Sequence, residues 1–352
     1  MGIFVKGIIT KRLKIMENFF ERENLRYAMI GSGSWATALA KLLLNNKEKI
    51  SWYVRDDEMI DQIKKSKHNP YYLQAVKFDP DRIEMSSDIN EVIEGADVLV
   101  FCVPSAYFLG EAQNIKVSLD NKFIVSAIKG IIPGDNITVA EYFNQNYDIP
   151  FSRIGVVSGP CHAEEVAMER LSYLTLSSKH LEVARSLCDL FSCDYIRTLP
   201  GTDIYGVEFA AVLKNVYAVA AGVCHALSYG DNFMAVLITS SFHEMRDFLH
   251  ATHPDIKRKT STSAYLGDLL VTCYSQFSRN RTFGSMIGKG YSVQSAQVEM
   301  NMVAEGYYST KCIYEINKKY GVHMPIAEAM YRILYEGKYP AYIIKQLSEN
   351  LQ

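Results

Sequence analysis

Hydrophobic and polar positions follow two different patterns in the two parts of the chain. Up to about residue 200, short apolar runs alternate with amphipathic segments, the first of which predicts a helix over 35–45. Buried parallel strands are almost continuously apolar, and their alternation with helices is typical of α/β folds. The pattern therefore predicts an N-terminal, Rossmann-like doubly wound sheet domain. Its strands are expected over 27–31, 50–55 and 96–104, and from 122, 153 and 172 onwards.

The strand pattern fades near Leu199-Pro200-Gly201, and long helical patterns take its place. We therefore expect a sheet domain over 27–200 and an all-helical domain over 201–352. The segment 1–26 is basic and then acidic, and its apolar pieces are too short for a signal peptide. We expect it to be a weakly ordered extension, with Met16 as an alternative start. The helical patterns cover 205–228, 232–250, 262–275, 309–319 and 325–335.

Composition narrows the class of protein. The 352 residues include 37 basic and 39 acidic ones, which argues against nucleic-acid binding through bulk positive charge. No run of eighteen apolar residues occurs, so we do not expect an integral membrane protein. The seven cysteines are odd in number and form no C-x-x-C pair, which favours a reduced, cytoplasmic protein. The eight histidines form no H-E-x-x-H motif, and we expect no metal site.

The segment G-S-G-S-W-A, from Gly31 to Ala36, matches the G-x-G-x-x-G/A fingerprint of dinucleotide-binding folds. It follows a predicted strand and opens a predicted helix, which is the context that makes the motif credible. Gly31 permits the tight turn, Gly33 lets the backbone approach a pyrophosphate, and the small Ala36 lets helix and strand pack closely. The helix N-terminus also favours the negative charge of phosphate. The sequence therefore predicts a dinucleotide cofactor.

The end of the second predicted strand bears on the choice of cofactor. An acidic residue there usually binds the ribose hydroxyls of NAD, whereas an arginine accommodates the 2′-phosphate of NADP. This strand ends in Arg55, followed by Asp56 and Asp57. Arg55 suits the phosphate and the acidic neighbours permit NAD, so either cofactor fits and NADPH is preferred.

The helix predicted over 205–228 is apolar or small on every side, yet Lys214 and Asn215 lie in its middle. Burying an ammonium group is costly unless the group is paired or loses its proton. Lys214 therefore either extends to solvent or carries a proton that can be transferred. A second lysine, Lys129, follows the strand that begins at 122, at the strand end where open α/β sheets bind ligands.

Six motifs follow one another along the chain, over essentially residues 27–340. They are G-S-G-S-W-A-T-A-L-A, S-A-I-K-G-I with Lys129, S-G-P-C-H-A-E-E-V-A, L-K-N-V-Y-A-V-A-A-G with Lys214, G-D-L-L-V-T-C-Y…S-R-N-R over 267–281, and V-A-E-G over 303–306. In this order they resemble the motifs of bacterial biosynthetic NAD(P)-dependent glycerol-3-phosphate dehydrogenases. Two positions depart from that family's pattern. Ala36 replaces a glycine, and Cys161 replaces a serine or threonine. The second change removes a hydroxyl donor, which a backbone N–H could replace.

The resemblance implies reduction of dihydroxyacetone phosphate to sn-glycerol 3-phosphate for phospholipid synthesis, by hydride transfer from nicotinamide C4 to the C2 carbonyl. It implies that Lys214 transfers the proton, that Lys129 polarises the carbonyl, and that Asp268 orients Lys214. The cofactor, NADP(H) or NAD(H), would be bound by Gly31, Gly33, Ser34, Trp35, Ala36, Arg55, Lys129, Ala163, Arg279, Val303 and Glu305. The substrate would be bound by Lys129, Gly159, Cys161, Lys214, Asn215, Asp268, Thr272, Ser278, Arg279 and Asn280.

Other interpretations of these residues remain open. Asp268 follows a glycine at a predicted helix start and could serve as an N-cap, with Thr272 on the same helical face. The chain could also be a dehydrogenase of another β-hydroxyacid or hydroxyacyl substrate, or a non-enzymatic dinucleotide sensor. The two lysines and the S-R-N-R motif favour a phosphate ester, and a sensor has no need for Lys129, Lys214 and Asp268 together. A homodimer is compatible with the sequence.

Overall fold

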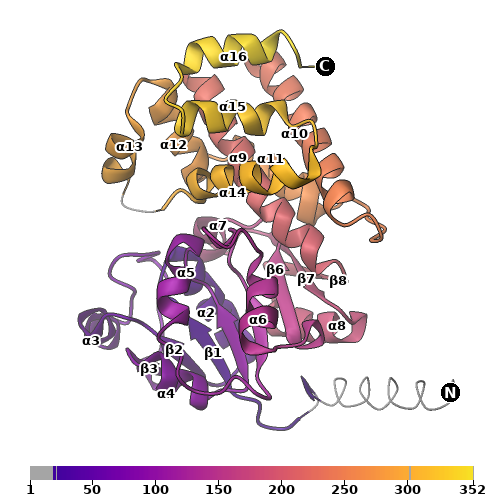
Figure 1. The fold of residues 1–352 in the computed structure, drawn as a ribbon. Helices are drawn as coiled ribbons and strands as arrows, with labels where there is room; N and C mark the ends of the chain where they lie inside the picture. Colours follow the sequence, from indigo (N-terminus) through magenta and orange to yellow (C-terminus); the bar gives the residue numbers. More distant parts are fainter. Residues whose placement is uncertain (1–18, 21, 301–302, 352) are drawn as a thin grey trace, which may run out of the picture.

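The computed structural model describes residues 19–20, 22–300 and 303–351. A sheet domain lies at the bottom of Figure 1, and a helical domain lies above it. The sheet has eight strands in the order β3-β2-β1-β4-β5-β6-β7-β8. They are β1 (Tyr27–Ile30), β2 (Ile50–Tyr53), β3 (Ile83–Ser86), β4 (Val98–Phe101), β5 (Phe123–Ser126), β6 (Ile154–Ser158), β7 (Ser172–Ser178) and β8 (Ile196–Gly201).

Neighbouring strands are parallel except β6 and β7, which are antiparallel. The predicted fold class, a Rossmann-like sheet domain followed by a helical domain, is confirmed. The antiparallel pair was not predicted: only a short segment with the five-residue helix α7 (Ala163–Ala167) joins β6 to β7. A parallel pair usually has a full helix as its crossover, and α7 has only five residues. Strands β3 and β8 were also missed, because both are edge strands in which only the first residue is fully buried.

Helices cover both faces of the sheet. Alternate residues of each strand face opposite sides, so Met29 and Val98 lie in one apolar cluster, and Ile30 and Leu99 lie in the other. The cluster that contains Ile30 continues into the helical domain, so the two domains share one core. Apart from α7, the helices of the sheet domain are α2 (Ser34–Asn46), α3 (Asp57–Ser66), α4 (Ile89–Glu94), α5 (Ser105–Ala112), α6 (Val139–Tyr147) and α8 (Leu181–Phe191), with 3-10 turns η1 (Pro80–Arg82) and η2 (Phe151–Arg153).

The helical domain contains all five predicted helical segments. The segment predicted over 262–275 begins as a π-helical turn, η3 (Ser263–Gly267), before α11. Helices α12, α13 and α16 were not predicted, because the first begins in the polar S-R-N-R segment and the other two are short. The helices are α9 (Ile204–Ala226), α10 (Asp231–Thr252), α11 (Asp268–Tyr274), α12 (Arg279–Gly288), α13 (Val293–Glu299), α14 (Glu305–Tyr320), α15 (Pro325–Leu334) and α16 (Pro340–Ser348).

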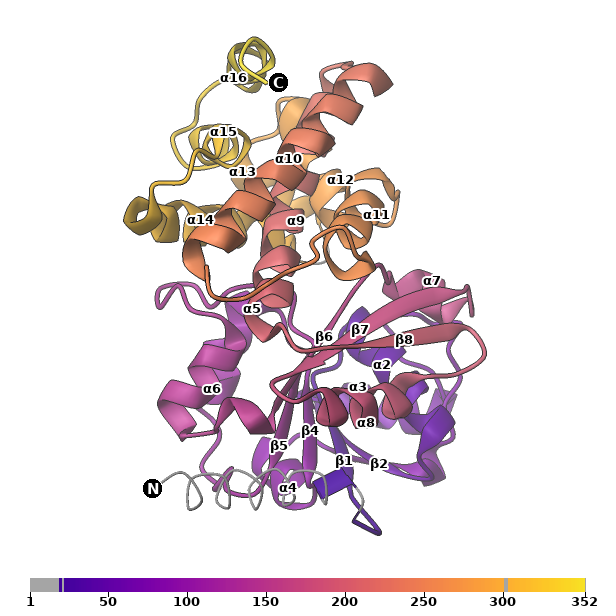
Figure 2. The ribbon, with the colours of Figure 1, turned by 90° about the vertical axis from the view of Figure 1, so that its right-hand side faces the viewer.

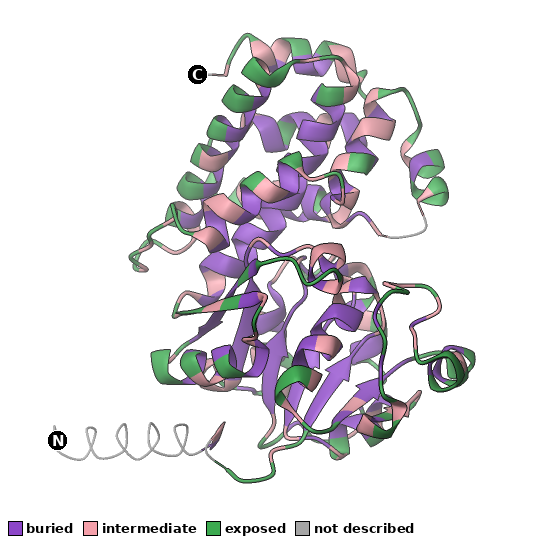
Figure 3. Cartoon of the chain, turned by 180° about the vertical axis from the view of Figure 1, so that it is seen from behind, coloured by how far each residue is buried: buried purple, intermediate pink, exposed green. Residues whose placement is uncertain are grey.

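Helix α9 is the central element of the structure. Figure 2 shows it rising from the sheet domain through the middle of the helical domain, and Figure 3 shows that most of it is buried. It is long and apolar enough to cross a membrane, but its most apolar window is completely buried in the fold. We therefore interpret α9 as a core helix. Within the described ranges, no other helix meets the same criteria of length and composition.

Two glycines let neighbouring helices approach α9 closely. A Cβ atom on Gly284 of α12 would overlap the backbone carbonyl of Val219, and one on Gly306 of α14 would overlap that of Asn215. Both contacts are with backbone atoms, which cannot move aside as a flexible side chain could. The close packing therefore fixes α12 and α14 against the part of α9 that carries Lys214.

Most of the extension expected over 1–26 lies outside the described residues, which omit 1–18 and 21. Phe19 and Phe20, which belong to it, are described. Their rings lie 5.7 and 4.9 Å from the ring of Phe123 on β5, centroid to centroid, and Phe19 is 4% exposed. This part of the extension thus belongs to the core of the sheet domain.

Two buried glutamates accept hydrogen bonds from helix N-termini. Glu208 of α9 accepts from the N–H of Ala140 at the start of α6 (3.2 Å), and so joins the two domains. Glu244 of α10 accepts from the N–H groups of Ile326 (2.6 Å) and Ala327 (3.3 Å) in the first turn of α15. Burial raises the pKa of each carboxyl group to about 8. These side chains satisfy N–H groups that a helix cannot satisfy itself.

Glu244→Ala should lower the free energy of unfolding by about 1–3 kcal/mol, because two buried N–H groups lose their acceptor. The midpoint of urea unfolding measures the change. Glu315→Ala is the control, because Glu315 forms a partly exposed ion pair with Lys318, and it should shift stability by less than about 1 kcal/mol. Equal stability of Glu244→Ala and wild type would contradict the capping role.

Candidate active site

A cavity lies between the two domains, beyond the C-terminal ends of β1, β4 and β5, and encloses about 940 Å³ including space open to solvent. Ligands of open α/β sheets bind at this end of the strands. The structure brings most of the expected site residues together around the cavity. They are Gly33, Ser34, Trp35, Ala36, Lys129, Cys161, Ala163, Lys214, Asn215, Asp268, Thr272, Ser278, Arg279, Asn280, Val303 and Glu305.

Hydrogen bonds from side chains outside the cavity hold the glycine loop between β1 and α2 in place. The indole N–H of Trp52 donates to the carbonyl of Gly31 (2.7 Å), and the amide of Asn69 donates to the carbonyl of Ser32 (3.1 Å). Gly31 has φ +115°, and a Cβ there would overlap the backbone of Cys102. Only glycine fits this turn, and the N-terminus of α2 is thereby presented to the cavity.

Lys214 is buried, and its ammonium group is paired. Its Nζ lies 2.5 Å from Oδ1 of Asp268, while the Nζ of Lys129 lies 3.9 Å from Oδ2 of the same carboxylate. Lys214 is 4% exposed and Asp268 is 1% exposed. Burial lowers the pKa of Lys214 to about 8; Asp268 opposes this shift and Lys129 adds to it. The cavity thus contains an amine that gains or loses a proton close to neutral pH.

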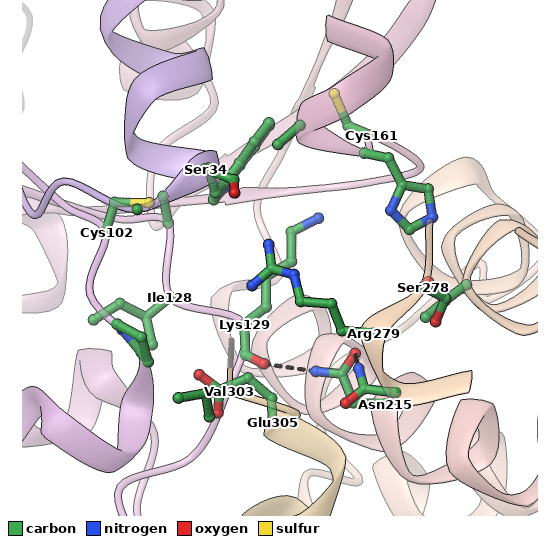
Figure 4. Close-up of a pocket in the computed structure, with 18 of the residues that line it drawn as sticks. Ser34, Cys102, Ile128, Lys129, Cys161, Asn215, Ser278, Arg279, Val303 and Glu305 are labelled. Carbon is green, nitrogen blue, oxygen red and sulfur yellow. Dashed lines mark hydrogen bonds between the residues drawn. The ribbon is translucent and has the colours of Figure 1, made fainter. Parts of the chain in front are cut away.

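A chain of amide hydrogen bonds links the two domains beside the lysines. Asn215 donates to the carbonyl of Lys129, Asn280 donates to the side-chain oxygen of Asn215, and the N–H of Gly306 donates to Asn280, each at 2.8 Å. Figure 4 shows the first of these bonds as a dashed line from Asn215 to Lys129. The side-chain oxygens of both asparagines are therefore occupied by protein donors.

Glu305 crosses from the helical domain to the sheet domain. Its carboxylate accepts from the backbone N–H (2.8 Å) and the hydroxyl (2.5 Å) of Ser105, the first residue of α5. Burial raises the pKa of this carboxyl group, and the hydrogen bonds from Ser105 oppose that shift. Glu305 therefore borders the cavity while it also joins α14 to α5.

The segment S-R-N-R forms the start of α12. Ser278 is the N-cap and accepts from the N–H of Arg281 (3.3 Å), so its hydroxyl is used in helix capping. Figure 4 shows the side chain of Arg279 directed into the space next to Lys129. The helix N-terminus and the guanidinium group together make this side of the cavity attractive to an anion.

The structure corrects the alternative interpretation of Asp268 as an N-cap. Gly267 is the N-cap of α11, and Asp268 is the first helical residue, without a capping hydrogen bond. Its carboxylate instead pairs with Lys214 of α9. The hydroxyl of Thr272 donates to the backbone carbonyl of Asp268 (2.6 Å), which fixes the start of the helix.

Three expected residues do not line the cavity. Gly31 forms the turn at the start of the glycine loop, and the carbonyl of Gly159 accepts from Nζ of Lys129 (3.4 Å), so both shape the site without lining it. The side chain of Arg55 is 76% exposed and lies 3.5 Å from the carboxylate of Glu111. The other carboxylate oxygen of Glu111 accepts from the hydroxyl of Tyr53 (2.7 Å). Glu111 thus competes with a cofactor phosphate for Arg55, the residue that was expected to select the cofactor.

Several residues of the site were not predicted from the sequence. His162 and Phe277 line the cavity, and Trp52 and Asn69 support the glycine loop. His162 stands inside the S-G-P-C-H-A motif, so its position in the motif could have identified it. Trp52 and Asn69 are far from the glycine loop in sequence, and no local pattern connects them to it. Among the described residues, no group of His, Cys, Asp or Glu side chains could hold a metal ion.

The parallel sheet, the glycine loop and the cavity with its lysines define a two-domain dehydrogenase that uses a dinucleotide. Models of two domains, described as NAD-dependent glycerol-3-phosphate dehydrogenase N-terminus and C-terminus, match residues 26–184 and 203–345. The chain belongs to the family of NAD-dependent glycerol-3-phosphate dehydrogenases.

Curated relatives match over nearly the whole chain. The glycerol-3-phosphate dehydrogenase (NAD(P)+) of Chlorobium limicola is 35% identical over 316 residues, which are 89% of this chain and 94% of the relative. The enzyme of the same name from Streptococcus uberis is 36% identical over 321 residues, 89% of this chain and 93% of the relative. The crystal structure of a glycerol-3-phosphate dehydrogenase from Coxiella burnetii has a TM-score of 0.84 and 28% identity, and the match covers 93% of this chain and 99% of that one.

Proposed function

We propose that this protein catalyses the reversible NAD(P)-dependent reduction of dihydroxyacetone phosphate to sn-glycerol 3-phosphate, in the cytoplasm, for phospholipid synthesis. The observation that carries the proposal is the buried pair of Lys214 and Asp268, with Lys129 beside it, in a cavity that also contains the dinucleotide loop. The names of the curated relatives support the same activity.

The residues around the loop fit a dinucleotide. The N-terminus of α2 has no side-chain cap, and a Cβ on Gly33 would meet no atom within 4 Å, so a pyrophosphate can approach the backbone there. The indole N–H of Trp35 is buried without a hydrogen-bond partner among the described residues, and it can donate to a ligand. When bound here, a reduced nicotinamide supplies the hydride for the carbonyl carbon.

In this proposal Lys214 is the general acid for the reduction. The carbonyl oxygen that becomes an alkoxide needs a proton, and a lysine with a pKa of about 8 is mostly protonated at neutral pH but can release its proton. Asp268 holds the ammonium group in place through Oδ1. Lys129 adds positive charge on the same side, which stabilises the developing negative charge of the substrate oxygen.

Arg279 and the N-terminus of α12 are proposed to bind the phosphate of the substrate. A guanidinium group matches the geometry of phosphate oxygens, and the helix dipole adds to the attraction. Cys161 stands where the family that the motifs resemble has a serine or threonine hydroxyl. Burial raises the pKa of the Cys161 thiol to about 12, so the thiol stays protonated. It is a weak donor at that position.

The direct test of the proposal is an assay of NADPH and NADH oxidation with dihydroxyacetone phosphate and with unphosphorylated dihydroxyacetone. We expect turnover of the phosphate ester and little turnover of the free ketone. Preference for an unphosphorylated hydroxyacid or ketone would favour the alternative dehydrogenase. Binding of the cofactor without turnover of any of these substrates would favour the dinucleotide sensor.

Lys214→Ala should reduce kcat for the reduction by roughly 10²- to 10⁴-fold, because the proton donor is lost. In the wild type, kcat for reduction should fall as the pH rises through about 8, where Lys214 loses its proton. The oxidation of sn-glycerol 3-phosphate needs the neutral amine, so its rate should rise over the same range. Stopped assays across pH 6–10 measure both profiles.

The control for this variant is Lys318→Ala, because Lys318 is a surface residue paired with Glu315. It should retain the wild-type rate and both pH profiles. A rate for Lys214→Ala within about threefold of wild type would exclude Lys214 as the proton donor, since general acid catalysis contributes far more than that.

We propose that Arg55 binds the 2′-phosphate of NADPH, which requires its guanidinium to exchange Glu111 for the phosphate. Arg55→Ala should then lower kcat/KM for NADPH by roughly ten- to a hundredfold, the effect of one charged hydrogen bond. NADH use should change little, because it lacks this phosphate. Steady-state kinetics with both cofactors measure the ratio. Arg185→Ala serves as the control, because Arg185 is an exposed residue that is paired with Glu182 in the same way. An equal effect on both cofactors would contradict this role and the preference for NADPH.

A further inference from the structure

Three polar atoms of the cavity wall are buried without a hydrogen-bond partner among the described residues. They are Nε1 of Trp35, Nε2 of His162 and Oδ2 of Asp268. Buried polar atoms are almost always hydrogen-bonded, so each of these three calls for an explanation. The indole N–H can only donate, whereas a carboxylate oxygen can only accept. The function of the imidazole nitrogen depends on whether His162 is charged.

The surroundings of His162 keep its ring neutral. Burial, together with the positive charges of Lys214 and Lys129, lowers the pKa of His162 to about 4 against the opposing effect of Asp268. A neutral imidazole has one N–H and one acceptor nitrogen. The ring forms a hydrogen bond with the backbone of Val271, which accounts for the N–H. We therefore assign Nε2 as the acceptor.

The other polar groups of the cavity are mostly donors or already paired. Lys129, Lys214 and Arg279 have no acceptor atoms. The carboxylate of Glu305 accepts from Ser105, and the carbonyl oxygens of the two cavity asparagines accept from protein N–H groups. Oδ1 of Asp268 accepts from Lys214, and its Oδ2 lies 3.9 Å from the ammonium group of Lys129. Nε2 of His162 is thus an acceptor that no protein cation satisfies.

Dihydroxyacetone phosphate carries one free hydroxyl group, on C1, next to the C2 carbonyl. Its hydrogen needs an acceptor once the substrate leaves water. His162 lines the same cavity as Lys129, Lys214 and Asp268, the groups proposed to act on the C2 oxygen. C1 is one bond from C2, so its hydroxyl reaches this neighbourhood.

We propose that Nε2 of His162 accepts the hydrogen of the C1 hydroxyl group of dihydroxyacetone phosphate, which makes His162 a specificity-determining residue. This inference rests on the proposed function, and it explains how the site distinguishes a hydroxymethyl ketone phosphate from a methyl ketone phosphate. A site built to bind a hydroxyl group rejects an analogue that lacks it, because a buried polar group is then left unpaired.

The test compares kcat/KM for dihydroxyacetone phosphate with kcat/KM for hydroxyacetone phosphate, which has a methyl group in place of the C1 hydroxymethyl group. Wild type should prefer the former by about tenfold or more. His162→Phe, which keeps a ring but has no acceptor, should lose most of this preference by a selective fall with dihydroxyacetone phosphate. His162→Gln, whose amide oxygen can accept, should restore part of it.

His253→Phe is the matched control. His253 is a partly buried histidine with an unpartnered Nδ1 within the described chain and stacks on Tyr205 with ring centroids 4.2 Å apart, but it does not line the cavity. It should keep the wild-type preference between the two substrates. If His162→Phe lowers kcat/KM equally for both substrates, or for neither, the inference is wrong. If wild type turns over neither substrate, the proposed function itself fails.

Discussion

The burial of Lys214 is the constraint on which the rest of the structure depends. An ammonium group in the middle of an apolar core helix is unstable unless a carboxylate reaches it. Asp268 supplies that carboxylate from a helix that begins 54 residues later in the chain. The packing of α11 against α9 is therefore an electrostatic requirement as well as an apolar contact. The same burial that makes the pair necessary also moves the pKa of Lys214 to about 8.

Positions around this pair are fixed by contacts that allow little adjustment. Gly284 and Gly306 bring α12 and α14 into backbone contact with α9, and the hydrogen bonds from Asn280 to Asn215 and on to Lys129 continue from there. These bonds connect the helical domain to the loop that follows β5. Because the two domains also share one apolar cluster, the cavity between them is formed by a single packed unit.

The sequence predicted the fold class and most of the cavity residues, because strand and helix patterns are local and the site motifs are contiguous. It could not predict contacts between distant segments. Nothing near Asn69 or Trp52 indicates that they support the glycine loop, and the pairing of Arg55 with Glu111 depends on how α5 is placed beside β2. Asp268 was identified by its motif, and the resemblance implied its contact with Lys214, whereas the residue pattern alone left N-capping open.

The contact between Glu305 and Ser105 determines which helix N-terminus in the cavity attracts negative charge. The N-termini of α2 and α5 both follow strands at this end of the sheet, and each carries the positive end of a helix dipole. At α5 the carboxylate of Glu305 already occupies the first N–H group. The N-terminus of α2 therefore attracts the pyrophosphate of a dinucleotide, whereas the carboxylate of Glu305 at α5 repels it. The helical domain thus influences anion binding at the edge of a sheet to which it contributes no strand.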